Sequence, residues 1–129
     1  VPHIQIEYSA NLEGVIDMGA LCEAIRAKAS AIDTFPMAGI RVRATRVDFV
    51  AMADGDPRHG FIDLSVRLRE GRTDDIKREA IDRIFAALKT FTTPAMASYP
   101  IALSAEMRDI NANLSLKFGN IRDHLEGNA

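Results

Sequence analysis

The chain has few of the residues from which disulfides and metal sites are built. Among its 129 residues it has one cysteine, Cys22, and no tryptophan. One cysteine can form neither an internal disulfide nor a cysteine-based zinc site, so a reducing cytoplasm is the expected location. Cys22 lies within a helical pattern of apolar residues, and we interpret it as a small core side chain rather than a nucleophile.

The motifs of nucleotide and metalloprotease chemistry are also missing. There is no GxGxxG, no P-loop and no HExxH. The histidines His3, His59 and His124 are scattered without the spacing of metal ligands, so each is interpreted as a surface or strand-edge residue. We therefore expect a protein that works without a metal or an organic cofactor.

Charge and hydropathy argue against two classes of partner. Sixteen Lys and Arg stand against eighteen Asp and Glu, for a net charge of -2. Nucleic-acid-binding proteins normally show a clear basic excess, so nucleic acid is not an expected partner. No apolar run approaches the roughly 20 residues of a membrane-spanning helix, and the first residues do not form a secretory signal, so no membrane association is expected. A local group of arginines that binds a small anion is compatible with this balance.

What the sequence does contain is strand and helix patterns in a regular order. Apolar residues make up 47% of the chain, and its length is typical of one domain, which we place at residues 1–129. The patterns predict strands at 3–8, 40–52, 62–69 and 101–107, and helices from Asp17 to about residue 33 and from Thr73 to just before Pro94. Two β-α-β units of this kind predict an α+β fold, with a four-stranded mixed sheet and both helices on one face.

Two segments depart from simple periodicity. The alternation that begins at Ile40 changes parity near Thr45 and Arg46, which predicts a β-bulge inside one long strand. The tail from residue 111 onward is less periodic, and its apolar residues suggest one more short strand, at Leu114, Leu116 and Phe118. Because so small a sheet has exposed edges, we expect the chain to form an oligomer.

The residues suited to chemistry are a proline at the start of a strand and two arginines at the beginnings of regular elements. A free N-terminal Pro2 is a secondary amine, and α-amino groups titrate near about pH 8. Burial beside cations favours its neutral form, which can accept a proton. Arg41 follows a turn, and Arg72 follows Gly71 at the start of the second helix, where an arginine fork and the helix dipole both favour a carboxylate. By position alone, solvated or ion-paired surface residues are the more common situation for both arginines.

Five segments together are similar to one family. They are PHIQIEYSANL, FPMAGIRVR, VDFVAMADGD, EGR and LSAEM, in that order along the chain. This set resembles 5-carboxymethyl-2-hydroxymuconate isomerase, a family of the tautomerase superfamily. The resemblance spans nearly the whole chain, and FPMAGIRVR followed by MADGD is its most specific part.

The resemblance implies a cofactor-free isomerase that assembles as a homotrimer and acts on a small carboxylate-bearing dienol in homoprotocatechuate breakdown. The catalytic proline of the family falls on Pro2, and the arginines that bind the substrate carboxylates fall on Arg41 and Arg72. Lys117 and Asn120 resemble positions of a similar C-terminal segment, without an assigned role.

Val1 precedes Pro2 in the sequence. A proline acylated by valine is a tertiary amide, which is not a base. The resemblance therefore predicts that this position corresponds to an initiation codon, GUG, and that the initiating residue is removed before Pro2.

Two other functions stay open at this point. A tautomerase of another 2-hydroxydienoate, or of a phenylpyruvate-like enol, needs the same base and the same carboxylate-binding arginines. A non-catalytic trimeric binding protein of the same fold is the second alternative, since a fold alone does not establish chemistry. A residue retained before Pro2 would favour this second alternative.

Overall fold

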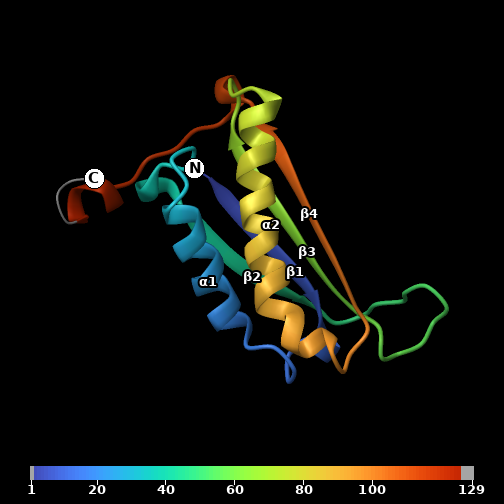
Figure 1. Cartoon of the computed structure of the whole chain (residues 1–129). Coiled ribbons are helices and arrows are strands. Elements are labelled where there is room, and N and C mark those ends of the chain that lie inside the picture. The colour runs from blue at the N-terminus through green and yellow to red at the C-terminus, as the bar shows by residue number, and fades with distance from the viewer. Residues whose placement is uncertain (1, 126–129) are drawn as a thin grey trace.

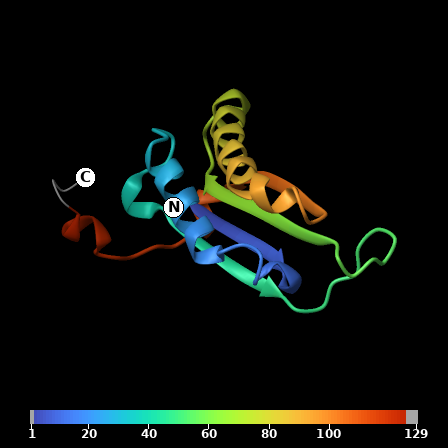
Figure 2. The same ribbon diagram turned by 60° about the horizontal axis from the view of Figure 1, so that its bottom comes forward.

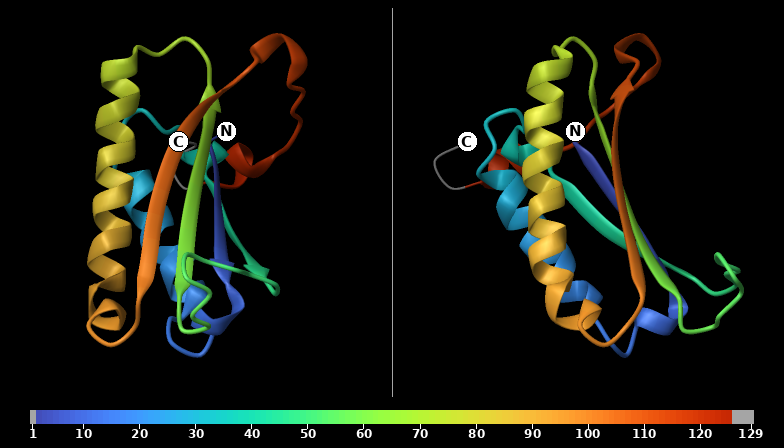
Figure 3. Two further views of the ribbon diagram at one scale, coloured as in Figure 1. Left: turned by 90° about the vertical axis from the view of Figure 1, so that its right-hand side faces the viewer. Right: turned by 45° about the vertical axis from the view of Figure 1, so that its right-hand side comes forward.

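The computed structural model describes residues 2–125, so the expected removal of Val1 concerns a residue outside the described part. Four strands form one sheet in the order β2-β1-β3-β4: β1 (His3–Ser9), β2 (Arg41–Val47), β3 (Gly60–Arg69) and β4 (Ile101–Ile110). β1 is parallel to β2 and antiparallel to β3, and β3 is parallel to β4. Helices α1 (Met18–Ser30) and α2 (Asp74–Met96) both cover the same face (Figures 1 and 3). The predicted α+β fold is confirmed.

The core lies between the helices and one face of the sheet. Alternate residues of β1 and β3 point into it and are buried: Ile4, Ile6, Tyr8, Ile62, Leu64, Val66 and Leu68. The helices contribute Leu21, Ile25, Ala80, Ile84 and Leu88 from their inner faces. The residues between these core positions lie on the open face, where the strand register aligns four basic side chains in one row: Arg41, His3, Arg67 and Arg108.

Both helices begin at the predicted cap. The Asp17 carboxylate accepts a hydrogen bond from the Ala20 amide at 3.0 Å, and the Thr73 hydroxyl accepts one from the Ile76 amide at 3.3 Å. These bonds satisfy amides that have no partner within the helix. α1 ends at Ser30, two or three residues before the predicted end.

The prediction that the second helix ends before Pro94 is wrong. α2 continues through Pro94 to Met96. Proline in the last turn removes only one backbone hydrogen bond of the helix. The hydroxyls of Thr92 and Thr93 donate to the carbonyls of Leu88 at 2.9 Å and Lys89 at 2.7 Å, which gives this turn additional bonds.

The predicted bulge in the second strand is also wrong. β2 pairs with β1 without interruption from His3 opposite Arg41 to Ser9 opposite Val47, and it ends there. The parity changes inside the regular pairing, where Arg46 lies opposite Tyr8, and the later apolar residues Phe49 and Ala51 belong to the loop after the strand. Residues 48–59 form a loop that projects from the sheet (Figure 2), and the side chain of Phe49 is 96% exposed.

The C-terminal tail does not form the predicted short strand. Within the described residues it contains two short 3-10 helices, Ala112–Leu114 and Ile121–His124, joined by an extended segment. This segment leaves the sheet after β4 and runs toward the turn before β2 (Figure 1), so it has no neighbouring strand to bond. Leu114 and Leu116 are 83% and 98% exposed, and Phe118 is fully exposed.

Within residues 2–125, no helix is both long enough and apolar enough to cross a bilayer.

Candidate active site

The strand directions bring the three predicted site residues to one end of the sheet. β1 and β2 are parallel, so both begin at this end, with Pro2 just before β1 and Arg41 at the start of β2. β3 is antiparallel to β1 and ends there, which places Arg72 at the same end after a turn at Gly71. Gly71 has a φ of 114°, a conformation that favours glycine and sets the direction of the chain into α2.

Pro2 is buried and joined to β2 through its backbone. Its carbonyl accepts a hydrogen bond from the Arg41 amide at 3.2 Å. This bond extends the parallel pairing of the two strands by one step. It holds the backbone of Pro2 beside the first residue of β2.

A cleft of about 430 Å³ opens beside this strand end. One wall is formed by the first residues of β1 and β2 and by the turn at 36–39, and the other wall is formed by the tail. The lining residues are His3, Pro36, Ala38, Gly39, Arg41, Lys117, Phe118, Gly119, Ile121 and Arg122. The cleft therefore combines apolar side chains with several cations.

The structure places the two predicted arginines differently. Arg41 lines the cleft, and its Nη1 donates to the Gly39 carbonyl at 2.8 Å. Arg72 is not among the lining residues, and its Nη1 donates to the carbonyl of Arg69 at 3.0 Å. Pro2 does not line the cleft either, although His3 directly after it does.

His3 is the half-buried member of the basic row. Its Nδ1 lies 3.2 Å from Nη1 of Arg43. Burial lowers the pKa of His3, and the positive charges of Arg67, Arg43 and Arg41 lower it further. The imidazole is therefore neutral at neutral pH, so that Nδ1 can accept the hydrogen bond from Arg43.

The comparisons with known proteins agree with this geometry. A family model described as 5-carboxymethyl-2-hydroxymuconate isomerase matches residues 2–125. The chain belongs to this family. The 5-carboxymethyl-2-hydroxymuconate Delta-isomerase of Escherichia coli is 30% identical over 121 residues, which are 94% of this chain and 96% of the relative.

Solved structures give the same result for the fold. The crystal structure of a 5-carboxymethyl-2-hydroxymuconate isomerase from Deinococcus radiodurans R1 has a TM-score of 0.87 at 30% identity, covering 95% of this chain and 92% of the other. A fused 4-OT, described as a symmetric trimer, has a TM-score of 0.60 at 18% identity, covering 92% of each chain, and shares the fold alone. The predictions of family, fold and enzyme class are confirmed, and the protein is an isomerase.

Sequence reasoning missed part of the wall of this isomerase's cleft. The family resemblance indicates Lys117 without a role, and no motif indicates Arg122 or Phe118 as site residues. They enter the site because the tail runs from the end of β4 toward the turn before β2. No local pattern in the tail indicates that path.

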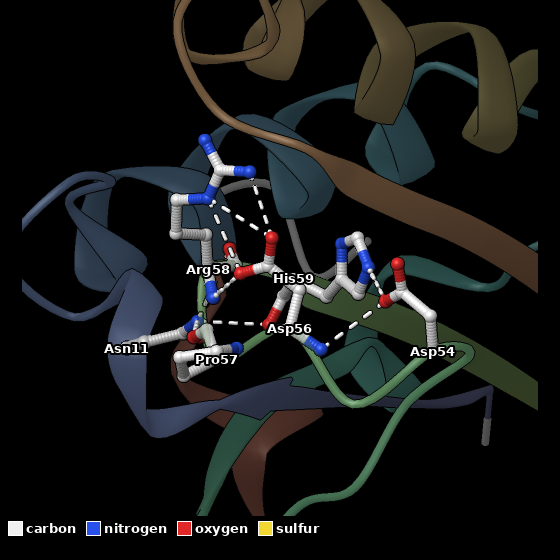
Figure 4. Close-up of polar contacts among 6 residues, drawn as sticks. All are labelled: Asn11, Asp54, Asp56, Pro57, Arg58 and His59. Atoms are coloured by element: carbon white, nitrogen blue, oxygen red, sulfur yellow. Dashed lines mark hydrogen bonds and ion pairs between the residues drawn. The ribbon is translucent and has the colours of Figure 1, made fainter.

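In the loop of residues 48–59, at the other end of the isomerase's sheet, charged side chains bond to one another (Figure 4). The Asn11 amide donates to the carbonyls of Pro57 at 3.2 Å and His59 at 2.8 Å. His59 Nε2 lies 2.7 Å from a carboxylate oxygen of Asp54, and Asp56 forms an ion pair of 2.7 Å with Arg58.

These contacts hold residues 54–59 in a folded loop. A smaller hollow of about 280 Å³ lies beside the loop. Its two acids, Asp48 and Asp56, are paired with Arg46 and Arg58, and within residues 2–125 no group of His, Cys, Asp and Glu side chains is placed to hold a metal ion.

Proposed function

We propose that the protein converts 5-carboxymethyl-2-hydroxymuconate to its oxo-pentene-tricarboxylate isomer in the breakdown of homoprotocatechuate, with the Pro2 nitrogen as the base. The supporting observation is the buried Pro2 at the start of β1, bonded to the first residue of β2, beside a cleft lined by cations and apolar side chains. Membership in the isomerase family makes this substrate the first one to test.

The reaction moves one proton and two double bonds. The Pro2 nitrogen takes the proton from the 2-hydroxyl group, and the electron pair of the broken O–H bond forms the C2 carbonyl. The C2–C3 double bond shifts to C3–C4, and the electron pair of the C4–C5 double bond takes the proton back from the protonated Pro2 nitrogen at C5. The base returns to its neutral form, so the step balances without any further reactant.

The base requires a free secondary amine at Pro2. A neutral amine is favoured both by burial and by neighbouring positive charge. Pro2 is buried, and the guanidinium groups of Arg41 and Arg67 flank His3 on the two neighbouring strands. Any residue that precedes Pro2 must therefore be removed before the protein is active.

The proposed role of Arg41 and Arg72 is to bind substrate carboxylates. Arg41 projects from the cleft wall beside Pro2, and Arg72 lies at the same end of the sheet. Anchored carboxylates keep the diene flat and oriented toward the base, so that negative charge spreads along it without rearrangement of the site.

The test uses protein that begins at Pro2, as verified by intact mass, and follows the loss of dienol absorbance in the ultraviolet. Replacing Pro2 with Ala is expected to lower kcat about 100-fold with little change in KM, because a positioned base contributes about 10²–10⁴ to the rate. Arg41→Ala and Arg72→Ala are expected to raise KM. Equal kcat values for Pro2→Ala and the parent protein would contradict the proposed base. Activity only on another enol acid would assign the alternative substrate.

We propose further that the protein assembles as a homotrimer. β2 and β4 are the edges of the sheet and have one unpaired side each. Leu114 and Leu116 are exposed on the tail, and Phe49 and Val50 are exposed on the loop after β2. A relative in fold, the fused 4-OT, is described as a symmetric trimer. Edges and apolar residues of this kind are commonly covered by other subunits.

A further inference from the structure

Three permanent cations line the cleft without a neutralising carboxylate. They are Arg41, Lys117 and Arg122, and none of the ten lining residues is Asp or Glu. Elsewhere the basic side chains form ion pairs, as Arg46 does with Glu13 at 2.6 Å and Lys77 with Asp109 at 3.1 Å. In the described part of the chain, no ion pair includes any of the three cleft cations.

This local excess of positive charge contrasts with the net charge of -2 of the whole chain. Like charges in one cleft repel each other, and a bound anion removes that repulsion. The basic row on the open face of the sheet adds to the positive potential at the same end, because it includes Arg41 and places Arg67 beside His3. The cleft is therefore suited to a ligand with several negative charges.

The cations are divided between the two walls. Arg41 belongs to the wall of the strand starts, next to Pro2, whose carbonyl its amide contacts. Lys117 and Arg122 both come from the tail, with Phe118 and Ile121 between them in the sequence and also in the lining. One wall thus has one cation near the proposed base, and the other wall has two cations with apolar side chains between them.

The proposed substrate has a matching division of charge. Muconate has one carboxylate at each end of a diene, and the 2-hydroxyl group lies next to the first of them. The carboxymethyl group at C5 adds a third carboxylate near the second. The molecule therefore has one carboxylate at the enol end and two at the C5 end, separated by an apolar conjugated chain.

We infer that Lys117 and Arg122 bind the two carboxylates at the C5 end, so that the tail makes the cleft selective for a tricarboxylate over a dicarboxylate. This inference rests on the proposed function for the identity of the ligand. Arg41, with Arg72 at the same end of the sheet, is left for the carboxylate beside the enol. Phe118 and Ile121 provide the apolar surface against which the diene lies.

The test compares two unreactive probes that differ by one carboxylate, propane-1,2,3-tricarboxylate and glutarate, in calorimetric titrations at pH 8. The wild-type protein is expected to bind the tricarboxylate about tenfold more tightly, since one additional charged hydrogen bond is worth about that factor. Lys117→Gln and Arg122→Gln are each expected to reduce this preference, and the double variant to abolish it. Glutarate affinity is expected to change less than about threefold in each single variant, because the remaining tail cation still binds its second carboxylate.

The matched control is Lys28→Gln. Lys28 is exposed on α1, outside the cleft lining, so its replacement removes the same charge without touching the tail. It is expected to keep the tricarboxylate preference. Circular dichroism of each variant checks that the fold is intact.

Binding of the probes does not require a base, so the result is independent of turnover. The preference is expected to persist in Pro2→Ala, and it tests the tail even if the wild-type protein fails to isomerise 5-carboxymethyl-2-hydroxymuconate. A wild-type protein without preference overturns the inference. It is also overturned if the double variant keeps the preference, or loses affinity equally for both probes.

Discussion

His3 illustrates how strand pairing changes the chemistry of a single residue. In the sequence it is one of three scattered histidines, and nothing near it indicates a special environment. In the sheet it lies between Arg41 and Arg67 and contacts Arg43 at 3.2 Å. Burial and these positive charges hold its pKa below the ordinary value of 6.5.

This lowered pKa predicts a loss of stability in mild acid. Between the pKa of the folded protein and that of the unfolded chain, near 6.5, the unfolded chain binds a proton that the folded protein does not. The contribution of His3 to the free energy of unfolding is therefore constant above pH 6.5 and falls as the pH decreases below it. We expect the free energy of unfolding of the wild type to fall relative to that of His3→Gln as the pH decreases below 6.5. Urea unfolding of both proteins from pH 5.5 to 8 measures it, and a difference independent of pH would contradict the expectation.

At the residue scale, the sequence indicated Pro2 and Arg41 as site candidates because the position of each along the chain suggests a chemical role. Pro2 is a potential secondary amine, and Arg41 directly follows a turn. Arg122 has no such position, and it reaches the cleft only through the path of the tail. Residues placed by long-range folding cannot be found from local spacing.

At the scale of elements, the beginnings of helices were predicted better than the ends of strands. Asp17 and Thr73 act on amides within three residues, so their capping depends on local sequence alone. The end of β2 depends instead on the length of β1, its neighbour in space, which ends at Ser9. A change of parity in the sequence cannot distinguish a bulge from the end of a strand when the partner is unknown.

The loop that follows β2 is held at its base by Asn11. Replacing Asn11 with Ala removes the amide that donates to the carbonyls of Pro57 and His59. We expect a loss of about 0.5–1.5 kcal/mol in the free energy of unfolding, because the freed carbonyls are exposed and can bond to water. Urea unfolding measures the loss, and hydrogen exchange is expected to show faster exchange of the Gly60 amide region. Asn113→Ala, an exposed substitution in the tail, is the control, and equal effects of the two variants would show that Asn11 does not anchor the loop.

At the scale of the whole molecule, the order of the elements explains the fold. The exposed apolar residues and sheet edges are explained only by a partner that covers them. Two β-α-β units predict the sheet and the covered face because each helix must bury its apolar stripe on the strands that flank it. By contrast, no other element within residues 2–125 covers the open face, the two sheet edges or the exposed tail. Leu114 and Leu116 alternate as in a strand, yet no strand within residues 2–125 lies beside them.

A second copy of the chain is the partner that the homotrimer proposal assigns to these residues. Burying a leucine side chain stabilises an assembly by about 1.5–3 kcal/mol, and in a closed trimer each substitution acts three times. The double variant Leu114→Ser and Leu116→Ser is therefore expected to shift the protein from an assembly of three 14.2-kDa chains toward single chains at micromolar concentration. Sedimentation velocity measures the shift. Ile76→Ser, which changes an exposed apolar residue at the start of α2, is expected to leave the assembly intact. A wild-type protein that sediments as a single chain would contradict the trimer, and an unchanged trimer in the double variant would place the subunit contacts at the sheet edges rather than at the tail.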